Sequence, residues 1–271
     1  MSERRQVIFF VDLLGARSRW SKGGRAAAEL AFQDFRNLIA HSIKGRQSDE
    51  LIHGLIETDA AALTFANVQS ALDVGKKMFS AAFEQTKNEK SRRPWLRGCI
   101  VARDGDSPLR TASNFSGPIS QVELMLYNPA LLNAISVEKS GFKGMRLLVS
   151  KTLISPVLTK ENKLSIGSLS FITLKKLRNS TYPKRIEGGF IDYLWMATED
   201  AERLTAMERI MARRLRASAH DAEEFAQAAA TQVLFHECAA IIGSLLTRQY
   251  FQSLKTGRRA AKSQQLAANK I

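Results

Sequence analysis

The sequence predicts an α+β fold, with a ferredoxin-like βαββαβ core and a helical extension at the carboxyl end. Over residues 1–200, short apolar runs typical of strands alternate with amphipathic segments in the order β-α-β-β-α-β, followed by α-β. From about Ala201 the chain is rich in Ala, Leu, Glu and Arg and shows no strand pattern. We therefore expect one folded domain over residues 1–200, and a helical extension with a basic tail over residues 201–271.

The first elements follow from local patterns. Val7–Val11 is a run of apolar residues rich in β-branched and aromatic types, typical of a strand covered on both faces, and Asp12 follows it. Three- and four-residue apolar spacing predicts a helix over Arg25–Ile43 that begins after the Gly23–Gly24 pair. Leu51–Phe65 contains two short apolar runs, LIHGLI and AALTF, separated by a polar triplet. This pattern predicts a β-hairpin.

The later elements are predicted in the same way. Asn67 is placed to cap a helix that continues to the charged stretch NEKSRRP. Beyond it we expect a helix over Pro129–Glu138 and strands over Leu96–Ala102, Arg146–Val149, Leu164–Leu177 and Phe190–Met196.

Composition narrows the classes of partner and of site. The chain has 40 Lys and Arg against 26 Asp and Glu, a net charge of +14, which favours an anionic partner such as a nucleotide, a nucleic acid or an acidic lipid surface. Two cysteines are too few for a disulfide framework or a four-thiolate zinc site. No apolar run approaches the length of a membrane span, so we expect a cytoplasmic protein without membrane contact.

Two acids are the first candidates for chemistry. In a βαββ core the end of the first strand lies beside the tip of the following hairpin, so Asp12 and Asp59 are expected at one edge of the sheet. Two carboxylates flanked by apolar strands repel each other unless a cation lies between them, and hard oxygen ligands suit Mg²⁺ or Mn²⁺. The alternative is that each is simply a turn residue.

Four segments, taken together, resemble a known family. VIFFVDLLGARS, LIHGLIETDAAALTF, WLRGCIVARDG and YNPALLNAISVEKSGFKGMRLLVS occur in the order found in class III nucleotidyl cyclase domains. The resemblance covers about residues 6–150 and continues more weakly to about residue 197. It is greatest to the pyrimidine cyclases of bacterial Pycsar anti-phage systems, which carry a DLLGF-like first motif and LRG at the fourth strand.

The resemblance implies a homodimer with active sites at its interface. It also implies two Mn²⁺ or Mg²⁺ ions per site, held by Asp12, Asp59 and the backbone carbonyl of Leu13. Leu14 and Gly15 match the turn whose amides hold the triphosphate, and helix N-termini are anion sites on independent grounds.

The choice of base follows from departures from the purine cyclases. Alignment places Leu132 and Ser136 where those enzymes carry an Asn and an Arg that contact the ribose and the transition state. It places His53 and Leu55 where a Lys reads the purine, so we expect these two residues at the nucleotide. The losses favour either a different base, as in the pyrimidine branch, or a degenerate, non-catalytic domain. Retention of both Asp12 and Asp59 argues against degeneracy. Similarity to the shorter chains of that branch favours uracil over cytosine.

Several basic residues are candidates for contacting the phosphates. Arg97 lies on a strand expected to run under the site, where it would steady the triphosphate or the transition state, or else pack its stem at a strand edge. Arg17, Arg19 and Lys22 follow the first turn and would reach the phosphates or form a solvated helix face.

The implied reaction converts UTP to cyclic UMP and pyrophosphate, a second messenger for a separate effector protein in anti-phage defence. A cytidylate cyclase making cyclic CMP is the first alternative. A non-catalytic, basic nucleic-acid-binding module is the second. It would use basic residues of the tail: Lys255, Arg258, Arg259, Lys262 and Lys270.

Overall fold

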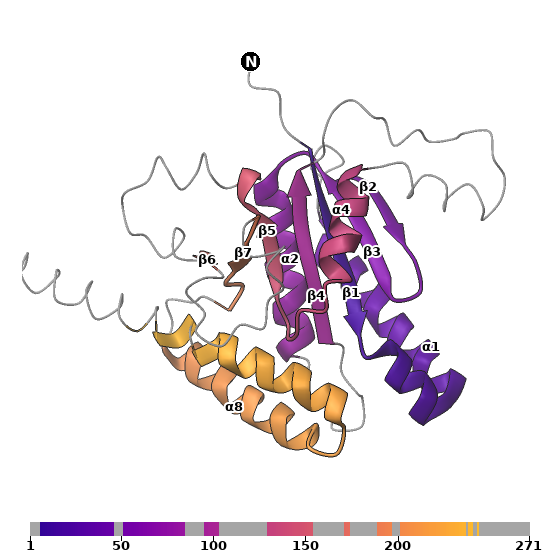
Figure 1. The fold of residues 1–271 in the computed structure, drawn as a ribbon, viewed down its shortest axis with the longest axis vertical. Helices are drawn as coiled ribbons and strands as arrows, with labels where there is room; N and C mark the ends of the chain where they lie inside the picture. The colour runs from indigo at the N-terminus through magenta and orange to yellow at the C-terminus, as the bar shows by residue number, and fades with distance from the viewer. Residues whose placement is uncertain are drawn as a thin grey trace, which may run out of the picture.

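A single seven-stranded sheet in the order β2-β3-β1-β4-β5-β7-β6 forms the centre of the protein (Figure 1). The computed structural model describes residues 6–45, 51–84, 95–102, 129–153, 171–173, 189–196, 201–236, 238–240 and 243. The strands are β1 (Val7–Leu14), β2 (Leu51–Ile56), β3 (Ala60–Phe65), β4 (Trp95–Ala102), β5 (Leu147–Ser150), β6 (Phe171–Thr173) and β7 (Phe190–Tyr193). The labelled helices are α1 (Ala16–Ile43), α2 (Val68–Glu84), α4 (Pro129–Glu138) and α8 (Ala201–Ala217), and residues 222–236 are also helical.

The first four strands have the topology that the sequence predicts. β1 pairs antiparallel with both β3 and β4, and β2 pairs antiparallel with β3 at the edge. β5 then pairs parallel with β4. The order of elements and the central position of β1 confirm an α+β fold with a ferredoxin-like βαββαβ core.

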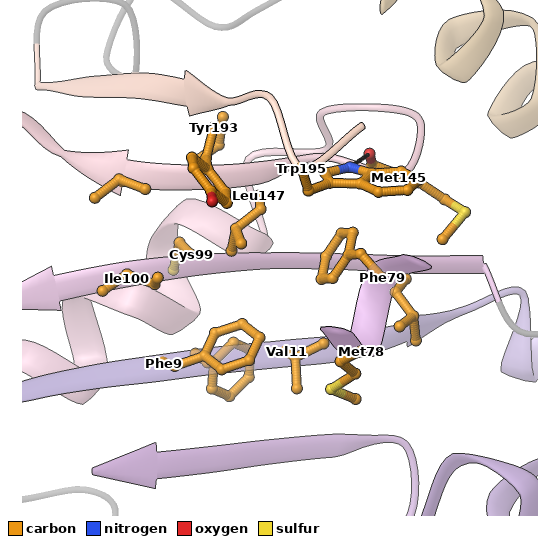
Figure 2. Close-up of a cluster of buried hydrophobic side chains, with 14 of the residues drawn as sticks. Phe9, Val11, Met78, Phe79, Cys99, Ile100, Met145, Leu147, Tyr193 and Trp195 are labelled. Carbon is orange, nitrogen blue, oxygen red and sulfur yellow. Dashed lines mark hydrogen bonds between the residues drawn. The ribbon is translucent and has the colours of Figure 1, made fainter. Parts of the chain in front are cut away.

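The two faces of the sheet are covered by different helices. Phe9 and Val11 of β1 point to the face on which α2 packs with Met78 and Phe79 (Figure 2). On the opposite face, the Cys99 thiol lies 3.6 Å from the Ala134 carbonyl oxygen of α4. Because side chains alternate along a strand, the even-numbered residues of β1, Asp12 among them, lie on the α4 face.

Several predicted boundaries agree with the structure. The helix Pro129–Glu138 and the hairpin of β2 and β3 are confirmed. The Asn67 carboxamide accepts a hydrogen bond of 2.9 Å from the Ser70 N–H, which confirms the predicted cap of α2. Of the predicted strand over Leu164–Leu177, Phe171–Thr173 is described, and the remainder lies outside the described residues.

The predicted helix over Arg25–Ile43 is present, and the structure adds a helical segment before it that the sequence analysis did not predict. α1 begins at Ala16, and Gly24 interrupts it with φ 67°, a left-handed conformation open to glycine. The glycine pair therefore marks a break within α1. Over the part of the chain that the structure describes, none of the helices combines the length and the apolar character needed to cross a bilayer.

The helical extension packs against one end of the sheet (Figure 1). The Gly144 N–H donates to Gln227 Oε1 at 2.7 Å, and the Met145 N–H donates to Thr231 Oγ1 at 2.9 Å. The Arg214 guanidinium of α8 lies 3.8 Å from the centre of the Trp95 ring. These contacts join α8 and the helical residues 222–236 to the sheet, while the division at residue 200 stays a prediction.

Candidate active site

Asp12 and Asp59 lie beside each other at the end of the β2–β3 hairpin. Asp12 is opposite Ala60 in the pairing of β1 with β3. The next residue of β1, Leu13, donates its N–H to the Asp59 carbonyl oxygen at 2.7 Å. The hydrogen bond from the Glu57 N–H to the Ala60 carbonyl oxygen, at 2.8 Å, closes the hairpin turn. The hairpin therefore fixes Asp59 next to the strand that carries Asp12, as the topology predicts.

The environment of Asp12 disfavours its charge. Burial raises the pKa of its carboxyl from an ordinary value of 3.8 to about 6, against the attraction of Arg97, and the Asp59 carboxylate raises it further. The Asp12 side chain is 15% exposed, so little water is available to stabilise the carboxylate. A cation bound at this carboxylate would offset both the cost of burying its charge and the repulsion from Asp59.

Arg97 lies between two carboxylates. It faces Asp12 across β1 and β4, and its Nη2 is 3.2 Å from Asp12 Oδ2. The same nitrogen also donates to Oε1 of Glu138. The guanidinium carbon lies 5.8 Å from the centre of the Phe142 ring. Burial lowers the pKa of Arg97, and the Asp12 carboxylate opposes this shift; a guanidinium nevertheless stays charged.

Glu138 is a site residue that sequence reasoning did not select. It is the last residue of α4, where the helix dipole disfavours an acid. An acid in this position is the one local sign that a cation approaches from elsewhere in the fold. The partner, Arg97, is 41 residues away in the chain, so the pair could not be identified without the sheet.

The turn that is predicted to hold the triphosphate joins β1 to α1. Leu14 ends β1 with its side chain buried, and Gly15 follows with φ 78° at the N-cap of α1. No atom lies within 4 Å of the position that a Cβ would take at Gly15, so the left-handed backbone, and not crowding, favours glycine there. The turn leaves the first amides of α1 without a side-chain cap.

The predicted base-reading positions lie on the edge strand. His53 pairs with Thr64, and Leu55 pairs with Ala62. Ala62 in turn faces Phe10 of β1, which places Leu55 on the same face of the sheet as Asp12. The positions of His53 and Leu55 on β2 are thus separated from Asp12 on β1 by the single strand β3.

Leu132 and Ser136 are both exposed on α4. Neither side chain can supply the charge or the carboxamide that the purine cyclases carry at these positions.

Lys22 has a different partner from the predicted one. Its Nζ forms a salt bridge of 2.6 Å with Asp221, the residue just before the helical residues 222–236. The hydrogen bond from Lys22 lowers the pKa of Asp221. Of the other candidates, the side chains of Arg17 and Arg19 and the tail residues 255–270 lie outside the described residues.

The two acids offer the oxygen ligands that a divalent metal requires. Asp12 and Asp59 supply carboxylate oxygens, which suit Mg²⁺ or Mn²⁺ with one or two protein acids and further oxygens from substrate and water. Within the described ranges, no group of three or more His, Cys, Asp or Glu side chains could hold a metal ion. The two carboxylates suit a metal ion whose coordination is completed by oxygens of substrate and water.

Comparisons with known proteins add the following. No family model and no curated protein sequence matches the chain. A crystal structure of an adenylate/guanylate cyclase/hydrolase from Silicibacter pomeroyi is 16% identical over 70% of this chain and 96% of that one, with a TM-score of 0.38. A bacterial light-regulated adenylyl cyclase is 12% identical, with a TM-score of 0.36. That alignment covers 76% of this chain and 56% of the light-regulated one. Because both TM-scores are low, the interpretation of the site rests on this chain's own geometry.

Proposed function

We propose that the chain is a metal-dependent pyrimidine nucleotide cyclase that converts UTP to cyclic UMP and pyrophosphate. The observation that carries this proposal is the meeting of Asp12 and Asp59, 47 positions apart in the sequence, beside a turn that leads into a helix. The family resemblance of the surrounding segments supports the reaction, and the proximity of the two acids supports their assignment to the site.

The reaction needs no side-chain nucleophile. The ribose 3′-oxygen attacks the α-phosphorus, the bond from that phosphorus to the oxygen bridging to the β-phosphate breaks, and pyrophosphate leaves. The hydroxyl proton is released, and no water or oxidant is consumed. When bound at Asp12 and Asp59, divalent ions would lower the pKa of the 3′-hydroxyl and neutralise charge on the α-phosphate and the leaving group.

This chain's own residues have the following parts in the proposal. Asp12 and Asp59, with the Leu13 carbonyl, hold the ions. Gly15 brings the first amides of α1 to the phosphates, where the helix dipole favours negative charge. Arg97 donates to a phosphate oxygen, because its fork geometry suits phosphate.

Uracil is proposed as the base on the family resemblance. The exposed Leu132 and Ser136 leave α4 without the groups that serve the ribose in purine cyclases. His53 and Leu55 are proposed to approach the base from β2. A homodimer with interfacial sites, a separate effector protein and a role in anti-phage defence belong to the same proposal.

The experiment is a panel of the four nucleoside triphosphates with Mn²⁺, with pyrophosphate and cyclic products identified by mass spectrometry. We expect UTP alone to yield pyrophosphate and cyclic UMP, and an Asp59→Ala variant to yield neither. Conversion of CTP would replace uracil by cytosine in the proposal. If no triphosphate is converted while polynucleotide binding falls steeply with salt, the nucleic-acid-binding alternative is correct.

A further inference from the structure

Arg97 is shared between two acids that belong to different elements. One nitrogen, Nη2, contacts Oδ2 of Asp12 on β1 and Oε1 of Glu138 at the end of α4. The exposed fractions of the three side chains are similar, at 14% for Arg97, 15% for Asp12 and 16% for Glu138. Charges with so little water require partners, and the guanidinium is a partner that the two acids share.

A divalent cation at Asp12 would change this balance. The cation would compete with Arg97 for the Asp12 carboxylate and repel the guanidinium, because unlike charges attract and like charges repel strongly where water is scarce. Arg97 Nε is buried and has no hydrogen-bond partner among the described residues. Moving the guanidinium away from Asp12 would therefore be costly if no other acid lay nearby. Glu138 is already in contact and can take the whole guanidinium.

Glu138 is held in place for this role. α4 packs on β1 and β4 through buried residues, and Ala134 lies against Cys99 one turn before the helix ends. Phe142, just beyond the helix, lies beside the guanidinium. The helix gains nothing from an acid at its last position. The contact with Arg97 is the interaction that accounts for a carboxylate there.

We propose that Glu138 is a positioning residue that retains Arg97 when a divalent cation takes its place on Asp12. Glu138 thereby lowers the cost of metal binding and keeps the guanidinium near the phosphates of the bound nucleotide. This inference rests on the part of the proposed function that assigns a metal to Asp12, and it does not depend on which base is used.

The test is Mn²⁺ binding to the full chain without nucleotide, followed by the electron paramagnetic resonance of free Mn²⁺. Four proteins are compared: the parent, Glu138→Gln, Arg97→Gln and the double variant. Glu138→Gln should weaken Mn²⁺ binding about fivefold or more, because Arg97 then stays on Asp12. Arg97→Gln should strengthen binding, because the competitor is gone. In the Arg97→Gln background, removing Glu138 should change the affinity by less than about twofold.

Three outcomes would overturn the proposal. Glu138→Gln could weaken Mn²⁺ binding equally in the parent and in the Arg97→Gln variant, which would make Glu138 a metal ligand or a general structural residue. Unchanged affinity in both would give it no part in metal binding. If Glu138→Gln does not fold, Arg97→Gln still decides, since weaker or unchanged Mn²⁺ binding in that variant contradicts competition. Glu84→Gln is the matched control, because its 3.0 Å salt bridge with Arg203 is exposed and belongs to other elements.

Turnover separates this inference from the proposed function. If UTP is converted, saturating Mn²⁺ should restore much of the rate of Glu138→Gln, whereas a fold defect would not respond to metal. If no triphosphate is converted but the Mn²⁺ cycle shows the expected coupling, the cyclase proposal fails and the role of Glu138 remains. If turnover is normal and the coupling is absent, the cyclase proposal stands and the proposed role of Glu138 fails.

Discussion

Arg97 and Asp12 face each other across neighbouring antiparallel strands, and a guanidinium nitrogen lies 3.2 Å from a carboxylate oxygen. The pair does not fully stabilise the acid, because burial and the nearby Asp59 still hold the pKa of Asp12 at about 6. Asp12 is thus a carboxyl group that is costly to ionise in the metal-free protein and lies next to a second acid. These are the electrostatic properties expected of a cation site.

The pH dependence of stability tests this property. Because the folded pKa of Asp12 lies above its ordinary value of 3.8, ionisation costs stability as pH rises from 3.8 to about 6, and the full cost persists above that. Asp12→Asn should therefore stabilise the metal-free protein at pH 7.5 by up to about 3 kcal/mol. The gain should disappear near pH 4. Thermal unfolding of both proteins across this range measures it, and a destabilised variant at pH 7.5 would show that the contact with Arg97 outweighs burial.

Removing the second acid should act on the first. Asp59→Asn eliminates a repulsion, so the pKa of Asp12 should fall toward its ordinary value in the metal-free protein. A carboxyl titration by NMR measures the shift. With metal and UTP, the same variant should lose activity by about 10²-fold or more, because the transition-state charge loses part of its stabilisation. An unchanged Asp12 titration would place the two carboxylates too far apart to share ions.

Arg97→Lys separates charge from geometry. Lysine keeps the positive charge but cannot contact two acids and a phosphate through one planar fork. We expect kcat to fall about 10²-fold with a smaller change in KM, since the donor acts on charge that develops during the reaction. Steady-state kinetics at saturating Mn²⁺ provide the measurement. Wild-type kcat in the lysine variant would reduce Arg97 to a simple counter-ion.

The extension should contribute to the stability of the sheet. Thr231→Val removes the acceptor of the Met145 N–H, and both groups are buried. An unpaired buried donor costs about 1–3 kcal/mol, which lowers the thermal midpoint by several degrees. Thr152→Val is the matched control, because its hydroxyl contact with Ser150 is exposed, and its effect should stay within about 0.5 kcal/mol. Equal effects of the two substitutions would argue against close docking of the extension.

Local signals in the sequence were sufficient for much of the fold. The proline at the start of α4, the Asn67 cap and the polar triplet of the hairpin each act within a few residues, and each appears in the structure where it was predicted. The start of α1 was missed because Gly24 was interpreted as a boundary. In the structure it is a single left-handed residue between two helical parts.

The site was only partly predictable for a related reason. The proximity of Asp12 and Asp59 follows from the order of strands, which the pattern reveals. The contact of Arg97 with Glu138 and that of Lys22 with Asp221 span 41 and 199 residues, and they depend on how α4 and the extension pack. Such distant contacts leave no periodic pattern in the sequence.

Anomalous diffraction from crystals containing Mn²⁺ and a UTP analogue that cannot cyclise tests most directly whether Asp12 and Asp59 share metal ions. We expect manganese peaks bound by the carboxylates of both Asp12 and Asp59, with phosphate oxygens completing the coordination and Arg97 moved toward Glu138. Manganese bound elsewhere, or a nucleotide bound with neither acid in contact with a metal, would contradict this expectation.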